Sequence, residues 1–142
     1  MTDPLMKVII AEDDEDDYFF MRDVFKEVSP QIKLTWVKDG AELIKFLTAG
    51  EHSNEDFKAI LLDLNMPKKD GRQTLKEIRE NLNIPNIPII VFTTSNAMAD
   101  VRYVESFKGT FFMTKPVSIA NYQSFAKILP DIIRQKSESS SL

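Results

Sequence analysis

Short apolar runs alternate along this chain with longer stretches in which apolar residues recur at helical spacing. Five runs predict strands, at residues 7–11, 32–37, 59–63, 89–93 and 111–114. Between them, stripes such as Tyr18, Met21 and Phe25 predict helices that each turn one apolar face toward a sheet. This alternation is typical of βα units built around a parallel sheet.

The composition of each run predicts its place in the sheet. Runs 7–11, 59–63 and 89–93 are almost continuous in large apolar residues, as expected of strands covered on both faces. Run 32–37 alternates polar and apolar residues and suits a half-exposed edge. Right-handed crossovers then give an α/β fold, a doubly wound five-stranded parallel sheet in the order 2-1-3-4-5. Ligands of such sheets bind outside the carboxyl ends of the strands.

The length of 142 residues suits one domain over 1–142, without a separate output module. We expect a folded core over about 6–134 and a flexible tail over 135–142, where serine and charged residues predominate. Pro130 lacks a backbone N–H and should kink or end the last helix, which begins near Ile119.

Composition excludes several classes of function. The net charge of -4 without a basic block argues against direct nucleic-acid binding. Apolar runs are too short for a membrane span, and the start MTDPLMKV does not resemble a secretory signal. The chain has no cysteine, which excludes disulfides and thiolate chemistry. These features predict a cytoplasmic protein.

Carboxylates gather where the first strand ends. Six consecutive acids occupy 12–17, and we interpret Asp14 to Asp17 as acids that favour a helix N-terminus. Glu12 and Asp13 directly follow the buried strand, and Asp63 closes the third strand, its expected neighbour. Clustered carboxylates repel each other unless a cation neutralises them, and hard oxygen ligands suit Mg²⁺.

Two further polar residues end the neighbouring strands. Thr93 closes the fourth strand and Lys115 follows the fifth, so a hydroxyl and an ammonium should reach the same edge as Asp63. An aspartate can act as a nucleophile toward phosphorus, while Mg²⁺, Lys and hydroxyl groups stabilise the charge of the transferred phosphoryl oxygens. The pattern therefore predicts a phosphoryl-transfer site.

Four elements in this order resemble response-regulator receiver domains: ED at Glu12 and Asp13, LLDLNMP around Asp63, VFTTS around Thr93, and TKP over 114–116. The resemblance covers the folded chain and implies a flavodoxin-like, single-domain regulator similar to chemotaxis regulators. The stretch LDLNMPKKDGR is similar to small regulators that partner phytochrome-type histidine kinases.

The resemblance assigns roles to residues. Asp63 is implied as the phosphoacceptor, with Thr93 and Lys115 on the phosphoryl oxygens. The implied Mg²⁺ ligands are Asp13, Asp63, the backbone carbonyl of Asn65, and Glu12 mainly through water. Thr93 and Phe112 are the implied switch residues. Receivers often have Tyr at the position of Phe112. The alternative interpretation of Phe112 is packing on an edge strand. The resemblance also makes the bond before Pro116 a candidate for the cis form.

By the same resemblance the chain is a signalling protein, not an enzyme acting on a separate substrate. It would accept a phosphoryl group from a sensor histidine kinase or phosphotransfer protein and later lose it by autodephosphorylation. The face made by the fourth helix, fifth strand and fifth helix would carry the signal to an output protein. A role as relay or phosphate sink, and a homodimer, remain open.

Three other functions share parts of this pattern. A phosphatase of the haloacid dehalogenase type needs a second Asp two places after the nucleophile, where this chain has Asn65. An FMN carrier needs a phosphate-binding loop after the first strand, where EDDEDD would repel phosphate. A pseudo-receiver that only binds partners is disfavoured because every required position is filled. His52 and Trp36 are interpreted as a loop residue and a packing residue.

Overall fold

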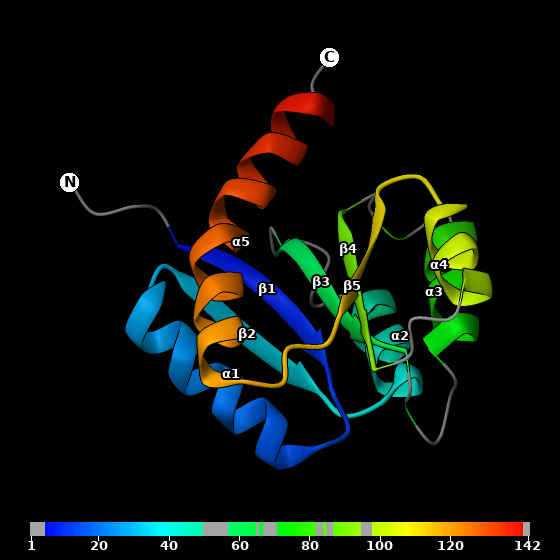
Figure 1. Ribbon diagram of the computed structural model, residues 1–142. Helices are drawn as coiled ribbons and strands as arrows, with labels where there is room; N and C mark the ends of the chain where they lie inside the picture. Colours follow the sequence, from blue (N-terminus) through cyan, green and yellow to red (C-terminus); the bar gives the residue numbers. More distant parts are fainter. Residues whose placement is uncertain are drawn as a thin grey trace.

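The computed structural model describes residues 5–49, 57–64, 66, 71–81, 84, 87–94 and 98–140, with side chains as far as 135. Its strands are β1 (Met6–Ala11), β2 (Ile32–Val37), β3 (Phe57–Asp63), β4 (Ile89–Thr93) and β5 (Thr110–Thr114). Its helices are α1 (Glu15–Val28), α2 (Gly40–Thr48), α3 (Gly71–Glu80), α4 (Met98–Glu105) and α5 (Ile119–Ser140). The five predicted strands are all present (Figure 1).

The strands form one parallel sheet in the order β2-β1-β3-β4-β5, which confirms the predicted doubly wound topology. The register pairs Ala11 with Leu62, and Asp63 with Phe92. The carboxyl ends of β1, β3 and β4 are therefore almost level, and the residues that follow them share one edge of the sheet.

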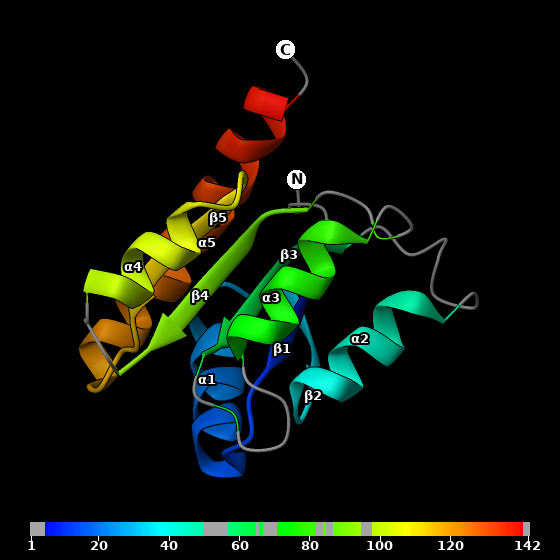
Figure 2. The ribbon, with the colours of Figure 1, turned by 90° about the vertical axis from the view of Figure 1, so that its right-hand side faces the viewer.

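Successive residues of the central strands point to opposite faces, and each face has its own apolar core. One core lies between the sheet and helices α1 and α5, and includes Val8, Leu61 and Phe125. The other lies between the sheet and helices α2, α3 and α4, and includes Ile9 and Leu62. Figures 1 and 2 show the two helices on one side of the sheet and the three on the other. Burial on both faces explains why residues 8–11, 59–62 and 89–92 of these strands are all apolar.

Of the two expected effects of Pro130, a kink or the end of the helix, the second is not observed, because α5 continues to Ser140. In a regular helix the amide of residue 130 would donate to the carbonyl of Ala126, and proline cannot. The hydroxyl of Ser29, at the end of α1, donates to that carbonyl at 2.6 Å instead. Because Ser29 and Ala126 are both buried, this bond satisfies a carbonyl that Pro130 leaves without its helical donor.

The backbone of residues 135–140, part of the expected flexible tail, continues α5 in the structure. The part of α5 that packs on the core through Tyr122, Phe125 and Leu129 has already met the unfavourable free energy of helix nucleation. Each further residue then adds one hydrogen bond to the existing helix. The last turns extend beyond the rest of the fold in Figure 1. Within the described part of the chain, no helix is both long and apolar enough to cross a membrane.

Candidate functional site

The end of β1 delivers Glu12 into the fold and Asp13 to its surface. Glu12 is 2% exposed, whereas Asp13 is exposed. The backbone at Glu12 is held on both sides: its N–H donates to Val37 O at 3.1 Å, and its carbonyl accepts from Trp36 Nε1 at 2.8 Å. The Trp36 ring in turn stacks on Tyr18, with centroids 4.3 Å apart. Trp36 therefore does more than pack, because it fixes the backbone beside the acidic pair.

Asp63 closes β3 and is 5% exposed. The next residue, Leu64, donates its N–H to Phe92 O at 2.8 Å, which keeps β3 paired with β4 to its last residue. Gly71 opens α3 against this strand end, and a Cβ there would lie 2.6 Å from Leu64 Cα and 2.8 Å from Asp63 O. The close approach of α3 to the Asp63 backbone therefore requires glycine at this position.

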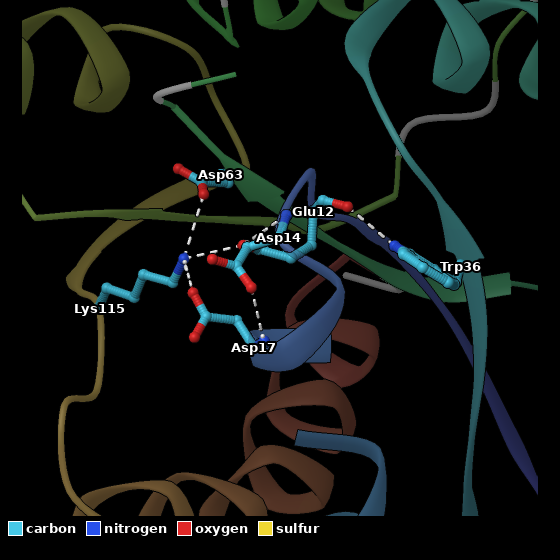
Figure 3. Close-up of polar contacts among 6 residues, drawn as sticks. All are labelled: Glu12, Asp14, Asp17, Trp36, Asp63 and Lys115. Carbon is cyan, nitrogen blue, oxygen red and sulfur yellow. Dashed lines mark hydrogen bonds and ion pairs between the residues drawn. The ribbon is translucent and has the colours of Figure 1, made fainter. Parts of the chain in front are cut away.

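Lys115 reaches the same edge from β5. Its backbone N–H donates to Thr93 O at 3.0 Å, which places it beside the end of β4. Its Nζ lies 2.9 Å from Glu12 Oε1, 2.9 Å from Asp17 Oδ2 and 3.2 Å from Asp63 Oδ2 (Figure 3). The side chain of Lys115 is only 11% exposed. Strand ends far apart in sequence thus converge on one ammonium, as the topology predicted.

The electrostatics of this edge favour added positive charge. Burial, with the charge of Asp63 as a further cause, raises the pKa of Glu12 to about 8 despite its bond to Lys115. Burial would lower the pKa of Lys115, but the carboxylates of Asp17, Glu12 and Asp63 outweigh it and raise that pKa. Glu12 thus holds its proton more tightly than usual mainly because it is buried, and Lys115 because carboxylates surround it.

Three carboxylates are close enough to share a cation. Ligand oxygens of Glu12, Asp13 and Asp63 lie within 4.8 Å of one another. They are hard oxygen donors, two buried and one exposed, so a cation could bind them and keep water on its open side. The structure thus brings together the three predicted carboxylate ligands. The fourth predicted ligand, Asn65, lies outside the described residues, as does His52.

The predicted switch residues lie at the adjoining edge of the sheet. Thr93 is fully buried at the end of β4, and Phe112 on β5 pairs with Val91. Phe112 is half-buried and packs against the core beneath α2, α3 and α4. The two residues thus lie on the neighbouring strands β4 and β5.

Comparison with known proteins agrees with this geometry. The sequence profile of the response regulator receiver domain matches residues 8–126. The chain belongs to the response-regulator receiver family. It is 37% identical to response regulator Rcp1 of Synechocystis sp. over 116 residues, which are 80% of this chain and 79% of Rcp1. As a receiver, it is a component of two-component signalling.

Solved receiver structures resemble it over most of their length. The Mn²⁺-bound form of response regulator Rcp1 matches with a TM-score of 0.73 and 31% identity, over 86% of this chain and 89% of that one. The phosphorylated cyanobacterial phytochrome response regulator RcpA matches with a TM-score of 0.79 and 27% identity, over 93% and 96%. The flavodoxin-like fold inferred from the sequence is thereby confirmed.

One candidate feature of this receiver's site is not observed, and one residue was missed. No peptide bond among the described residues is cis, so the bond before Pro116 is trans, the form that X-Pro bonds intrinsically prefer. Asp17, interpreted as a helix N-terminal acid, instead contacts Lys115. Nothing in the local sequence distinguishes Asp17 from the other acids of the run 12–17.

Proposed function

We propose that this receiver accepts a phosphoryl group from a histidine kinase or phosphotransfer protein onto Asp63, in a Mg²⁺-dependent reaction, and loses it by autodephosphorylation. One observation carries the proposal: Asp63 ends a buried strand within 3.2 Å of Lys115 and shares a carboxylate cluster with Glu12 and Asp13. The proposal retains the cytoplasmic location expected from the sequence.

The chain's own residues supply the nucleophile and its surroundings. A carboxylate oxygen of Asp63 forms the new O–P bond as the P–N bond to the donor imidazole breaks, and the donor leaves as free histidine. Lys115, already beside Asp63, faces the charge that arrives with the phosphoryl oxygens. Thr93 is proposed to donate its hydroxyl to one of these oxygens.

Glu12, Asp13, Asp63 and the carbonyl of Asn65 are proposed to hold the Mg²⁺ ion. When bound, the ion supplies positive charge to the phosphoryl oxygens. The close group of three carboxylates supports this site. The relative Rcp1 has been solved in a Mn²⁺-bound form, which supports a divalent cation here as well.

Phosphorylation tests the proposal directly. The protein should acquire one phosphoryl group from acetyl phosphate when Mg²⁺ is present, and almost none when the ion is chelated, because the crowded carboxylates would otherwise repel the donor. Intact-mass spectrometry measures both. Stoichiometric modification without a divalent cation would contradict the proposed cation site.

The phosphorylated state is proposed to be signalled through the face of α4, β5 and α5. Phosphate on Asp63 adds roughly two negative charges beside Thr93. If the Thr93 hydroxyl is drawn to them, the space it leaves is open to the ring of Phe112 on the neighbouring strand. Phe112 has no hydroxyl to bond with a partner or loop, so its ring should favour the inward position more than a tyrosine would.

Thr93→Ala should separate phosphoryl binding from this surface change. At saturating beryllofluoride, a phosphoryl mimic, NMR resonances of α4 and β5 should shift in the parent protein and remain near their free positions in Thr93→Ala. A modification shifts a two-state equilibrium only if it interacts unequally with the two states. The Thr93→Ala variant lacks the hydroxyl whose bond to the phosphoryl group is proposed to favour the signalling state. Equal shifts in both proteins would show that the signal bypasses Thr93.

A phytochrome-type histidine kinase is the proposed phosphodonor, and the similarity to the phytochrome response regulator RcpA supports it. Phosphotransfer profiling against the histidine kinases of the source organism would identify the donor. The fastest transfer should come from a kinase of this type.

A further inference from the structure

The ammonium of Lys115 has one more carboxylate partner than the proposed phosphoryl chemistry uses. Glu12 Oε1 and Asp63 Oδ2, at 2.9 and 3.2 Å, belong to the proposed cation site. The third partner is Asp17, whose Oδ2 lies 2.9 Å from Nζ. A lysine ammonium has three N–H donors, so these carboxylates match its donors in number (Figure 3).

Asp17 differs from the other two partners in its surroundings. Its side chain is 40% exposed, whereas those of Glu12 and Asp63 are 3% and 6% exposed. Among the described residues, the carboxylates grouped closely enough to share a cation are those of Glu12, Asp13 and Asp63. Asp17 therefore binds Lys115 from the solvent side and from helix α1, outside the proposed cation ligands.

The N-terminus of α1 turns the Asp17 side chain toward Lys115. Asp14 caps the helix by accepting the N–H of Asp17 at 3.1 Å. An acid at Asp17's position in a helix often bonds back to the N–H of the capping residue. Here the Asp14 N–H donates to Glu12 Oε1 at 3.4 Å instead. The Asp17 carboxylate contacts Lys115.

We propose that Asp17 is a positioning residue for Lys115 that reduces competition between the lysine and the cation. It offers the ammonium a counter-charge that is not a cation ligand. Without it, Lys115 would depend on Glu12 and Asp63 alone, and a divalent cation would have to displace it from both. This role rests on the proposed function, since it presumes the cation site.

Calorimetric titration with Mg²⁺ tests the role. Asp17→Asn should weaken cation binding by up to about five-fold, the upper end of the range for exposed charge pairs. The matched control is Asp16→Asn, which removes the same charge from an exposed position in the same helical turn. The control should weaken binding less, because only long-range attraction is lost.

Lys115→Met provides the decisive background. Without the lysine, Asp17→Asn should lose its excess effect and resemble Asp16→Asn. A direct attraction between Asp17 and the cation would instead persist without Lys115, so an undiminished Asp17→Asn effect in that background would overturn the proposal. Circular dichroism checks that each variant folds, and Lys115→Gln repeats the cycle if the methionine variant does not.

The proposed function and this inference fail in different ways. If the parent protein binds no Mg²⁺, the cation site is wrong and the role of Asp17 is overturned with it. If the parent binds Mg²⁺ and the Asp17→Asn and Asp16→Asn variants bind it equally, only the role of Asp17 is overturned.

Discussion

Replacing Asp63 with asparagine should abolish phosphorylation completely. Asparagine has nearly the shape of aspartate but no anionic oxygen, so it cannot form the O–P bond at a useful rate. Glu12 should not substitute, because burial raises its pKa to about 8 and so reduces its fraction of carboxylate at neutral pH.

The fold should survive this change. Asp63 is buried in a crowded group of carboxylates, and removing its charge lessens their mutual repulsion. Intact-mass spectrometry with acetyl phosphate and Mg²⁺ measures the loss, and circular dichroism confirms folding. Asp16→Asn is the matched control and should be modified like the parent. Stoichiometric phosphate on folded Asp63→Asn would show that the nucleophile is another residue.

The order of the strands could be predicted because burial on both faces leaves a strong mark on sequence. The runs that are almost continuously apolar form β1, β3 and β4, and the alternating run forms the edge strand β2. The positions of Glu12, Asp63 and Lys115 followed from topology alone. Residues that follow parallel strands reach the same edge of the sheet, whatever lies between them in sequence.

The side-chain contact of Asp17 could not be predicted in the same way. A run of six acids at a helix start looks alike at every position, and macrodipole stabilisation explains it without any partner. Which acid meets Lys115 depends on how α1 is rotated against β5. That rotation is set by the packing of Tyr18 and Met21 into the core, which no local pattern describes.

Pro130 shows a second limit of sequence reasoning. The local rule that proline disrupts a helix is sound, because the lost hydrogen bond leaves a carbonyl unsatisfied. Here the replacement donor, Ser29, is 97 positions away from Ala126 in the chain. Helices α1 and α5 pack side by side on one face of the sheet, so the tertiary fold supplies what the helix cannot.

Ser29→Ala should therefore destabilise the protein by about 1–3 kcal/mol, the cost of a buried polar group left without a partner. The carbonyl of Ala126 would have neither the Ser29 hydroxyl nor a helical N–H, and Ala126 is 0% exposed. Equilibrium urea unfolding measures the loss. The matched control is Ser124→Ala, at an exposed position of α5, the helix that contains Ala126. It should change stability little.

A double-mutant cycle with Pro130→Ala identifies the cause. Alanine at 130 restores the N–H that can donate to Ala126, so Ser29→Ala should cost clearly less in that background than in the parent. Pro130→Ala alone should stabilise the protein, because proline in a helix interior is unfavourable by roughly 3 kcal/mol before compensation. An equal cost of Ser29→Ala in both backgrounds would mean that Ser29 stabilises the α1 and α5 contact in some way other than by satisfying this carbonyl.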